Sequence, residues 1–334
     1  MSKYLLSCDW GTTSFRLRLV DVRSRACVGE VMSGKGVSST FNEWQAGGGG
    51  VSREDFFRGM LLRSISELGG RSGFDLTNIP VVVSGMASSS IGMLELPYAE
   101  VPFALDSSGM LVRYLGTSAA FPYEILLVSG VRSSDDVMRG EETQLIGLYE
   151  LAGVDEDVKT TFVFPGTHSK HLYVQEGKMA GFKTFMTGEL FNLMVSGSIL
   201  KDSVILSKPD EYTPELWDAF RLGVVESGKS PILHALFTVR TRQLFGLLSK
   251  KQNAMYLSGL LIGAELRELT GEAHNQVVLC GGENLSAPYR QAIRTLGLAG
   301  RTRVIAPELS DQAAVYGHIR IFEHQRITLN KTSI

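Results

Sequence analysis

Apolar and polar residues follow two different periods along the chain, and together they predict an ordered series of strands and helices. Residues 4–22 hold an apolar run, a polar turn, and then an alternation of apolar and charged positions. A period of two is typical of strands, so this segment predicts two antiparallel strands joined by a turn. Residues 160–174 repeat the same order of strand, turn and strand. The repetition predicts a duplicated fold.

Other segments fill in the elements between and after these two hairpins. Residues 27–32 predict a third strand, and residues 34–50 are glycine-rich and polar. Helical spacing of apolar positions predicts a helix over residues 53–68. Short apolar runs predict buried strands at 79–83, 124–131 and 276–280. Asp135 and Asp136 have the character of helix N-cap residues before a helix over 137–149. The alternation of strands and helices indicates an α/β protein.

Length and composition favour two domains that act on a small molecule. A chain of 334 residues exceeds what a single core usually holds, and we expect domains at 1–134 and 135–334. The net charge of -2 provides no bulk attraction to nucleic acid or to an anionic membrane. The longest apolar run, residues 256–264, is too short to span a bilayer and predicts a buried helix.

The three cysteines, Cys8, Cys27 and Cys280, are isolated in the sequence. They lack the spacing of a zinc site or of a disulfide framework. The first residues lead directly into a strand and show no signal peptide. We therefore expect a cytoplasmic protein.

The turn of the first hairpin has the composition of a phosphate-binding loop. Asp9 places a carboxylate at the sheet edge, Gly11 permits close backbone approach, and Thr12 and Thr13 offer hydroxyls. A Walker-type loop is excluded, because the Gly-Lys-Ser/Thr sequence and the following helix are missing. A plain hairpin rich in Asp, Gly and Thr is the alternative interpretation.

Three segments in a fixed order resemble the phosphate 1, phosphate 2 and adenosine segments of the sugar kinase, heat-shock chaperone and actin superfamily. They are residues 9–14, 165–170 and 280–283. Further segments at 136–147, 185–191, 236–240 and 257–265 resemble the 2-dehydro-3-deoxygalactonokinase family, the sugar acid kinases of bacterial galactonate catabolism. This resemblance implies two ribonuclease-H-like domains of the actin-like ATPase type, with an active-site cleft between them.

The resemblance also implies a reaction, in which the γ-phosphate of ATP passes to the C6 hydroxyl of 2-dehydro-3-deoxy-D-galactonate. Such a transfer requires charge neutralisation, in-line positioning and a base. Asp9 is the residue expected to hold Mg²⁺, through water, because Mg²⁺ keeps much of its hydration shell. The nucleotide residues implied are Gly11, Thr12, Thr13, Gly166, Thr167, Ser169, Lys170, Gly281 and Gly282.

Asp136 is the leading prediction for the base, because it follows a buried strand directly upstream of the second hairpin. A simple N-cap role for Asp136 is the competing interpretation, and Glu141 and Glu142 are the alternative carboxylates. A substrate carboxylate requires a cationic partner, for which Arg139 is the prediction and a surface ion pair the alternative. The predicted acceptor site also includes Ser84, Gly85, Met86, Thr187, Gly188 and Glu189.

Two other functions stay open from the sequence. One is a kinase of the same superfamily for another sugar or sugar acid, and the other is an actin-like ATPase without a sugar acceptor. The second would need an inserted subdomain, which the sequence does not show. A homodimer is also left open.

Overall fold

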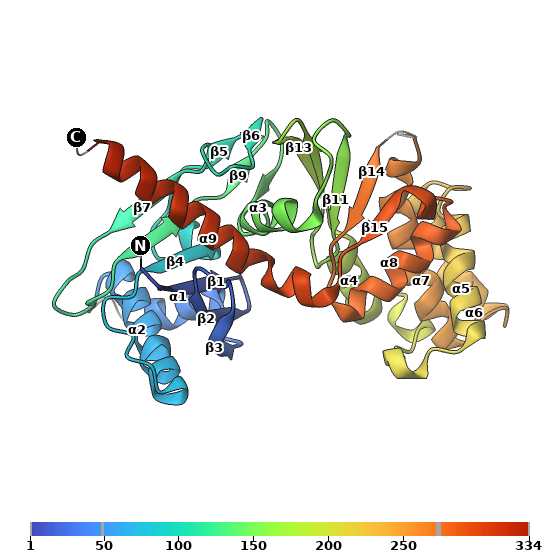
Figure 1. Cartoon of the computed structure of the whole chain (residues 1–334). Coiled ribbons are helices and arrows are strands. Elements are labelled where there is room, and N and C mark those ends of the chain that lie inside the picture. Colours follow the sequence, from blue (N-terminus) through green and yellow to red (C-terminus); the bar gives the residue numbers. More distant parts are fainter. Residues whose placement is uncertain (1, 48–49, 272–274, 333–334) are drawn as a thin grey trace. The chain divides into compact units, whose positions relative to one another are not determined.

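The structure is a computed structural model that describes residues 2–47, 50–271 and 275–332, and it divides into two compact units (Figure 1). Unit 1 comprises Met1–Val154, Gly177–Gly181 and Asp311–Ile334, and unit 2 comprises Asp155–Glu176 and Phe182–Ser310. The predicted boundary after residue 134 differs from this division, because residues 135–154 and most of the C-terminal helix belong to unit 1.

Unit 1 is built on a six-stranded sheet in the order β3-β2-β1-β4-β8-β7. The first three strands in the chain are antiparallel neighbours, whereas β4 runs parallel to β1 and β8 runs parallel to β4. The strands are β1 (Tyr4–Trp10), β2 (Phe15–Asp21), β3 (Cys27–Ser33), β4 (Val81–Gly85), β7 (Val112–Leu115) and β8 (Ile125–Val128).

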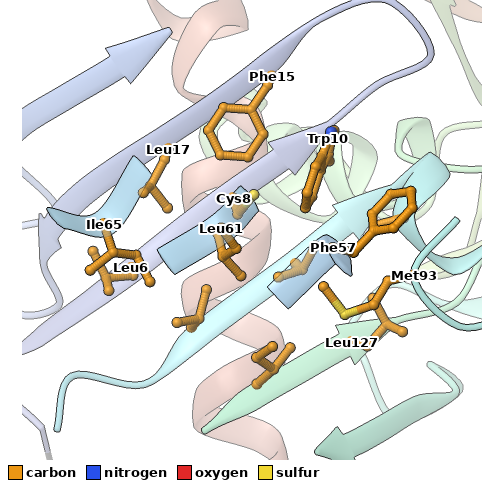
Figure 2. Close-up of a cluster of buried hydrophobic side chains, with 14 of the residues drawn as sticks. Leu6, Cys8, Trp10, Phe15, Leu17, Phe57, Leu61, Ile65, Met93 and Leu127 are labelled. Atoms are coloured by element: carbon orange, nitrogen blue, oxygen red, sulfur yellow. The ribbon is translucent and has the colours of Figure 1, made fainter. Parts of the chain in front are cut away.

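One face of this sheet is covered by α2 (Arg53–Ser72), whose apolar side chains form the core of unit 1 (Figure 2). Phe57, Leu61 and Ile65 of α2 are buried in one cluster with Trp10 and Phe15 of the first hairpin. The ring centroids of Trp10 lie 4.9 Å from those of Phe15 and 5.2 Å from those of Phe57. This packing fixes the hairpin that carries the predicted phosphate turn.

The remaining elements of unit 1 include the helices α1 (Val37–Ala46), α3 (Glu141–Ala152) and most of α9 (Pro307–Thr332), together with several short strands. The helix α9 contacts the sheet through its residues from Asp311 onward, since His318 lies against Ser7 of β1. The short strands are β5 (Ala99–Glu100), β6 (Phe103–Ala104), β9 (Val131–Arg132) and β10 (Val137–Met138).

Unit 2 repeats the strand arrangement of unit 1. Its strands follow the order β15-β14-β11-β12-β13, with β12 antiparallel to β11, and with β14 parallel to β11 and to β15. The elements of unit 2 are β11 (Thr160–Phe164), β12 (Ser169–Gln175), α4 (Thr187–Gly197), α5 (Pro214–Glu226), α6 (Ile232–Leu244), α7 (Lys250–Leu266), β14 (Gln276–Leu279), α8 (Glu283–Thr295) and β15 (Thr302–Val304). The strand β13 (Lys178–Phe185) belongs to unit 2 from Phe182 onward.

The structure confirms both predicted hairpins and the buried helix over residues 256–264, which is part of α7. It corrects the region around Asp135 and Asp136. These two residues lie between the paired strands β9 and β10, and the following helix, α3, begins only at Glu141 with Gly140 as its N-cap. The predicted N-cap role of Asp135 and Asp136 is therefore wrong. Across the described residues, every helix is either too short or too polar to cross a bilayer.

Candidate functional site

The first predicted phosphate turn lies at the end of β1 and is closed by its own backbone. The amide of Gly11 donates to the carbonyl of Ser14 at 2.9 Å, which leaves Thr12 and Thr13 exposed at the tip. The first amides of α1 hold this turn, since Val37 N donates to the carbonyl of Gly11 at 2.9 Å. The turn therefore presents hydroxyls to solvent on a backbone that the rest of unit 1 fixes.

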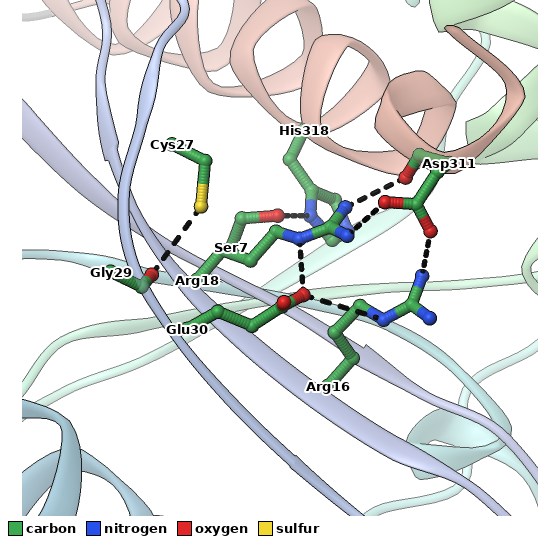
Figure 3. Close-up of polar contacts among 8 residues, drawn as sticks. All are labelled: Ser7, Arg16, Arg18, Cys27, Gly29, Glu30, Asp311 and His318. Carbon is green, nitrogen blue, oxygen red and sulfur yellow. Dashed lines mark hydrogen bonds and ion pairs between the residues drawn. The ribbon is translucent and has the colours of Figure 1, made fainter. Parts of the chain in front are cut away.

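Asp9 is half-buried at the same end of β1, and its environment contains both signs of charge. Burial raises the pKa of the Asp9 carboxyl, Arg16 and Arg18 oppose this shift, and Asp311 adds to it. Figure 3 shows how the cluster is connected, with Asp311 of α9 pairing with both arginines of β2. Arg18 also pairs with Glu30 at 2.7 Å. The two arginines therefore favour the charged form of Asp9, and their ion pairs with Asp311 and Glu30 hold them in place.

The predicted acceptor loop lies directly beside Asp9. In the parallel pairing of β1 with β4, Asp9 is opposite Ser84 and Trp10 is opposite Gly85. Gly85 has a φ of 83°, and an added Cβ would lie 2.7 Å from the carbonyl oxygen of Trp10. Met86 begins a short 3-10 turn, Met86–Ser88. The hydroxyl of Ser84 is buried and has no hydrogen-bond partner within the described chain, so a polar group is available next to Asp9.

Arg139 is held against the loop that follows Met86. Its guanidinium donates to the hydroxyl of Ser88 and to the carbonyl of Leu96, both at 2.8 Å, and lies 4.0 Å from the ring centroid of Tyr98. Its Nε is buried and has no partner in the described residues. Arg139 thus orders the predicted acceptor loop with these three contacts and retains one donor without a partner in the described residues.

Glu142 is a buried carboxyl group near this loop, and its surroundings shift its pKa strongly. Both of its oxygens accept from the amide of Gly140, at 2.9 and 2.8 Å, and Thr143 Oγ1 donates to it at 3.1 Å. Burial, with the charge of Glu141 as the second cause, raises the pKa of Glu142 from 4.5 to about 8. An added Cβ on Gly140 would lie 3.4 Å from the Cα of Gly85, so Glu142 follows a residue that contacts the acceptor loop.

Asp136 has a different setting. It lies in the connection between β9 and β10, where its carboxylate accepts from the amide of Val137 at 2.7 Å. Val137 and Asp135 on either side of it are exposed. This hydrogen bond holds Asp136 in its own turn, whereas the bonds of Glu142 are made to Gly140, which packs against Gly85.

The second predicted phosphate turn borders a cavity of about 350 Å³ within unit 2. Small-molecule sites are commonly about 300–1,000 Å³ and mostly apolar, with a few polar groups. Gly166 and Thr167 line this cavity, as do Thr187 and Gly188 at the start of α4. Its apolar wall comes from α7 and α8 and includes Met255, Leu261, Ile262, Leu285, Pro288 and Tyr289.

Ser169 and Lys170, the other predicted phosphate residues of this turn, are buried. The hydroxyl of Ser169 lies 2.7 Å from the hydroxyl of Tyr289, and Lys170 Nζ donates to Thr184 Oγ1 at 2.8 Å. Neither residue is part of the cavity wall. Binding phosphate through these side chains would require them to leave partners inside unit 2.

The predicted acceptor residues of unit 2 lie with the predicted nucleotide residues. An added Cβ on Gly188 would lie 2.6 Å from the carbonyl oxygen of Gly166, and the amide of Glu189 donates to the carbonyl of Thr167 at 3.0 Å. The carboxylate of Glu189 pairs with His168. The start of α4 therefore packs directly on the second turn.

Gly281 and Gly282 stand between β14 and α8, outside the cavity wall. An added Cβ on Gly281 would lie 3.4 Å from the ring of Pro165, which precedes the second turn. The segment of α8 that reaches the cavity, at Leu285, Pro288 and Tyr289, was missed from the sequence. Apolar residues at helical spacing are ordinary core signals, so the sequence alone could not mark them as a ligand wall.

The described residues contain no group of three or more His, Cys, Asp or Glu side chains that could hold a metal ion. Asp9 beside the exposed hydroxyls of the first turn offers a single carboxylate, and proteins often hold Mg²⁺ with one or two carboxylates, water and substrate phosphate.

The repeated sheet, with one polar turn after the first strand of each unit, defines a protein of the actin-like ATPase and sugar kinase fold. The (R)-2-hydroxyglutaryl-CoA dehydratase component A of Acidaminococcus fermentans shares this fold, at a TM-score of 0.50 and 14% identity over 97% of this chain and 99% of that one. A family model described as 2-keto-3-deoxy-galactonokinase matches residues 9–319. The chain belongs to this family.

Relatives with the same family name are similar over much of their length. The 2-dehydro-3-deoxygalactonokinase of Escherichia coli (strain K12) is 36% identical over 225 residues, 65% of this chain and 71% of that one. A Rhizobium meliloti (strain 1021) protein, named a probable 2-dehydro-3-deoxygalactonokinase, is 30% identical over 88% of this chain and 90% of its own. A crystal structure from Sinorhizobium meliloti, described as a candidate 2-dehydro-3-deoxygalactonokinase, has a TM-score of 0.74 and 26% identity, covering 95% of this chain and 96% of that one.

Proposed function

We propose that the chain is an ATP-dependent kinase that phosphorylates the C6 hydroxyl of 2-dehydro-3-deoxy-D-galactonate to give 2-dehydro-3-deoxy-6-phosphogalactonate. A bond forms between O6 and the γ-phosphorus, the bond from that phosphorus to the bridging oxygen of ADP breaks, and the O6 proton passes to a base. Family membership supports this activity, and the galactonokinase names of the relatives support the acceptor.

One structural observation carries the proposal. In each unit a central strand ends in a polar turn, and the groups that surround the two turns differ in chemistry. The first turn has a carboxylate, exposed hydroxyls and the Ser84–Met86 loop beside it. The second turn borders an apolar cavity. An apolar cavity suits a purine ring, and a carboxylate with free hydroxyls suits a metal-bound phosphate. We therefore assign the acceptor and Mg²⁺ to unit 1 and the nucleoside to unit 2.

Within unit 1, Asp9 would hold Mg²⁺ through water and Thr12 and Thr13 would donate to phosphate oxygens. Bound Mg²⁺ would neutralise the charge on the phosphates. Arg139 Nε and the hydroxyl of Ser84 are unpartnered buried donors on the acceptor side, and we assign them to the substrate carboxylate and a substrate hydroxyl.

We assign the base to Glu142 in preference to Asp136. A base is most effective when its pKa lies near the working pH, and the pKa of Glu142, about 8, meets this condition. Its connection to the acceptor loop through Gly140 and Gly85 supplies the second reason. Cytoplasmic location and a small-molecule partner follow from the proposed reaction.

The reaction is tested by measuring ADP release with 2-dehydro-3-deoxygalactonate, with its C4 epimer, with a neutral hexose and with no acceptor. We expect turnover to depend on the sugar acid, with phosphorus NMR showing a 6-phosphate product. Equal ADP release without acceptor would favour an actin-like ATPase, and turnover with the neutral hexose alone would refute the acid assignment.

The base is tested by Glu142→Gln and Asp136→Asn as a matched pair. Loss of a general base typically costs about 10²–10⁴-fold in rate, so we expect E142Q to lose that much of kcat while D136N stays close to the unmodified chain. In the unmodified chain, kcat should rise with pH up to about 8, and E142Q should abolish this rise. A large loss in D136N with a small one in E142Q would return the role to Asp136.

A further inference from the structure

A carboxylate that the proposed reaction does not use lies deep in unit 2. Glu265, on α7, is 3% exposed. A buried carboxylate is costly unless hydrogen-bond donors surround it. Three donors meet it, namely His171 Nε2 at 3.1 Å, the hydroxyl of Tyr289 at 2.7 Å and the hydroxyl of Thr187. These partners are themselves buried, so the carboxylate has almost no contact with solvent.

The three donors come from three different elements of unit 2. His171 belongs to β12, Thr187 is the first residue of α4, and Tyr289 belongs to α8. Thr187 and Tyr289 both line the cavity. Glu265 itself is absent from the wall, so it acts on the cavity only through these neighbours.

The same contacts reach the second phosphate turn. The Tyr289 hydroxyl lies 2.7 Å from Ser169 Oγ, at the foot of that turn. Gly188, next to Thr187, packs against the backbone of Gly166 and Thr167. The Glu265 carboxylate is therefore connected to the second turn through Tyr289 and to the start of α4 through Thr187.

We infer that Glu265 is a positioning residue for nucleotide binding, which holds Thr187 and Tyr289 at the cavity wall and so fixes the turn at Gly166 and Thr167. This inference rests on the proposed function, because it assigns the cavity to the nucleotide. Without the carboxylate, two buried hydroxyls lose their acceptor and are free to rotate toward other partners. The wall then loses its shape before the overall fold is lost.

Charge is part of this role. Burial, together with the negative charge of Glu265, raises the pKa of the Tyr289 hydroxyl, so Tyr289 stays a donor throughout the neutral range. Glutamine can replace only one accepting oxygen, whereas the carboxylate accepts on Oε1 and Oε2 together. Glu265→Gln should therefore weaken nucleotide binding less than Glu265→Leu.

The matched test compares Tyr289→Phe with Tyr256→Phe. Tyr256 is a buried tyrosine of α7 whose hydroxyl lies 2.8 Å from Thr238 Oγ1, and it is not in the cavity wall. Both substitutions remove one buried hydroxyl bonded to a side chain. The dissociation constant for ADP is measured on the full chain by calorimetry, with the melting temperature and with KM for ATP and kcat.

We expect Y289F, E265L and Thr187→Val each to raise the dissociation constant for ADP about tenfold or more, since each removes a hydrogen bond to a charged group that holds the cavity wall in place. Y256F should lower the melting temperature and leave the dissociation constant within about twofold, below the 1.4 kcal/mol that a tenfold change represents. A merely structural role predicts lower melting temperatures in all four with unchanged ADP binding, and that result would overturn the inference. ADP binding needs no acceptor, so failure of the proposed sugar acid reaction would be seen separately.

Discussion

His318 provides a quantitative test of how burial affects the stability of unit 1. Its imidazole is fully buried on α9, with Nδ1 2.7 Å from Ser7 Oγ (Figure 3). Burial lowers the pKa of His318 from 6.5 to about 3. The unfolded chain takes up a proton on this side chain below pH 6.5, and the folded chain does not. The contribution of His318 to stability is therefore complete above pH 6.5 and is lost as the pH falls toward 3.

The size of this effect follows from the shift itself. Each pH unit between the two pKa values changes the free energy of unfolding by about 1.4 kcal/mol. The free energy of unfolding should therefore fall by about 2 kcal/mol through His318 as the pH is lowered from 6.5 to 5. Glu142 acts in the opposite direction. Its folded-state pKa of about 8 lies above the usual 4.5, so its contribution is complete below pH 4.5 and is lost as the pH rises. Between pH 5 and pH 7 this loss amounts to about 2.5 kcal/mol, which offsets the change from His318.

Urea unfolding at pH 5 and pH 7 measures the balance of the two groups. We compare the difference in unfolding free energy, pH 5 minus pH 7, in each variant with that of the unmodified chain. His318→Asn, whose amide oxygen can take the place of Nδ1, should raise this difference by about 2 kcal/mol, and E142Q should lower it by about 2.5 kcal/mol. The exposed residue His234 gives the control, H234N, which should leave the difference unchanged. An unchanged difference in H318N would refute the claim that His318 is kept neutral by burial.

Two glycine pairs test the geometry of the two turns. Gly188→Ala should raise KM for ATP at least tenfold, because the added Cβ would lie 2.6 Å from the carbonyl oxygen of Gly166, whereas Gly197→Ala in the same helix meets no atom within 4 Å and should bind ATP normally. Gly85→Ala, at a φ of 83° and 2.7 Å from a carbonyl oxygen, should displace the acceptor loop and lower kcat about 100-fold, while Gly70→Ala on α2 should not. Normal kinetics in G188A or G85A would show that the corresponding turn does not bind a substrate.

The two hairpins could be predicted from sequence because their signal is local. The alternation of apolar and charged residues after Asp9 matches the period of β2, whose apolar positions Phe15, Leu17 and Leu19 are buried. The burial of Arg18 on the opposite face, where it bonds to Asp311 of α9, could not be predicted from this pattern. The polar turn needs no distant partner to be recognised. The parallel strand β4 could be predicted for the same reason, as a run of β-branched residues buried on both faces.

Other features depend on contacts that the local sequence does not contain. The helix α1 forms within the glycine-rich segment 34–50, where its first amides find acceptors in the carbonyls of Gly11 and Thr12. Asp135 and Asp136 have the composition of an N-cap, but pairing of Val131 and Arg132 with Val137 and Met138 takes that stretch into a hairpin. The helix start moves to Glu141, and this displacement places Glu142 after Gly140 and beside the acceptor loop.

The duplicated fold allows the two turns to be compared position by position, and they differ in the residue at the end of the strand. Asp9 stands two residues before the turn glycine Gly11, and the residue two before Gly166 is Phe164, at the end of β11. Phe164 and Pro165 cannot bind a cation, and the hydroxyl of Ser169 is engaged with Tyr289. The carboxylate nearest the second turn, that of Glu189, is paired with His168, whereas Asp9 stands at the strand end of the first turn. The second turn borders a mostly apolar cavity, and this difference between the two turns is the reason for proposing the nucleoside there and the metal-bound phosphate at Asp9.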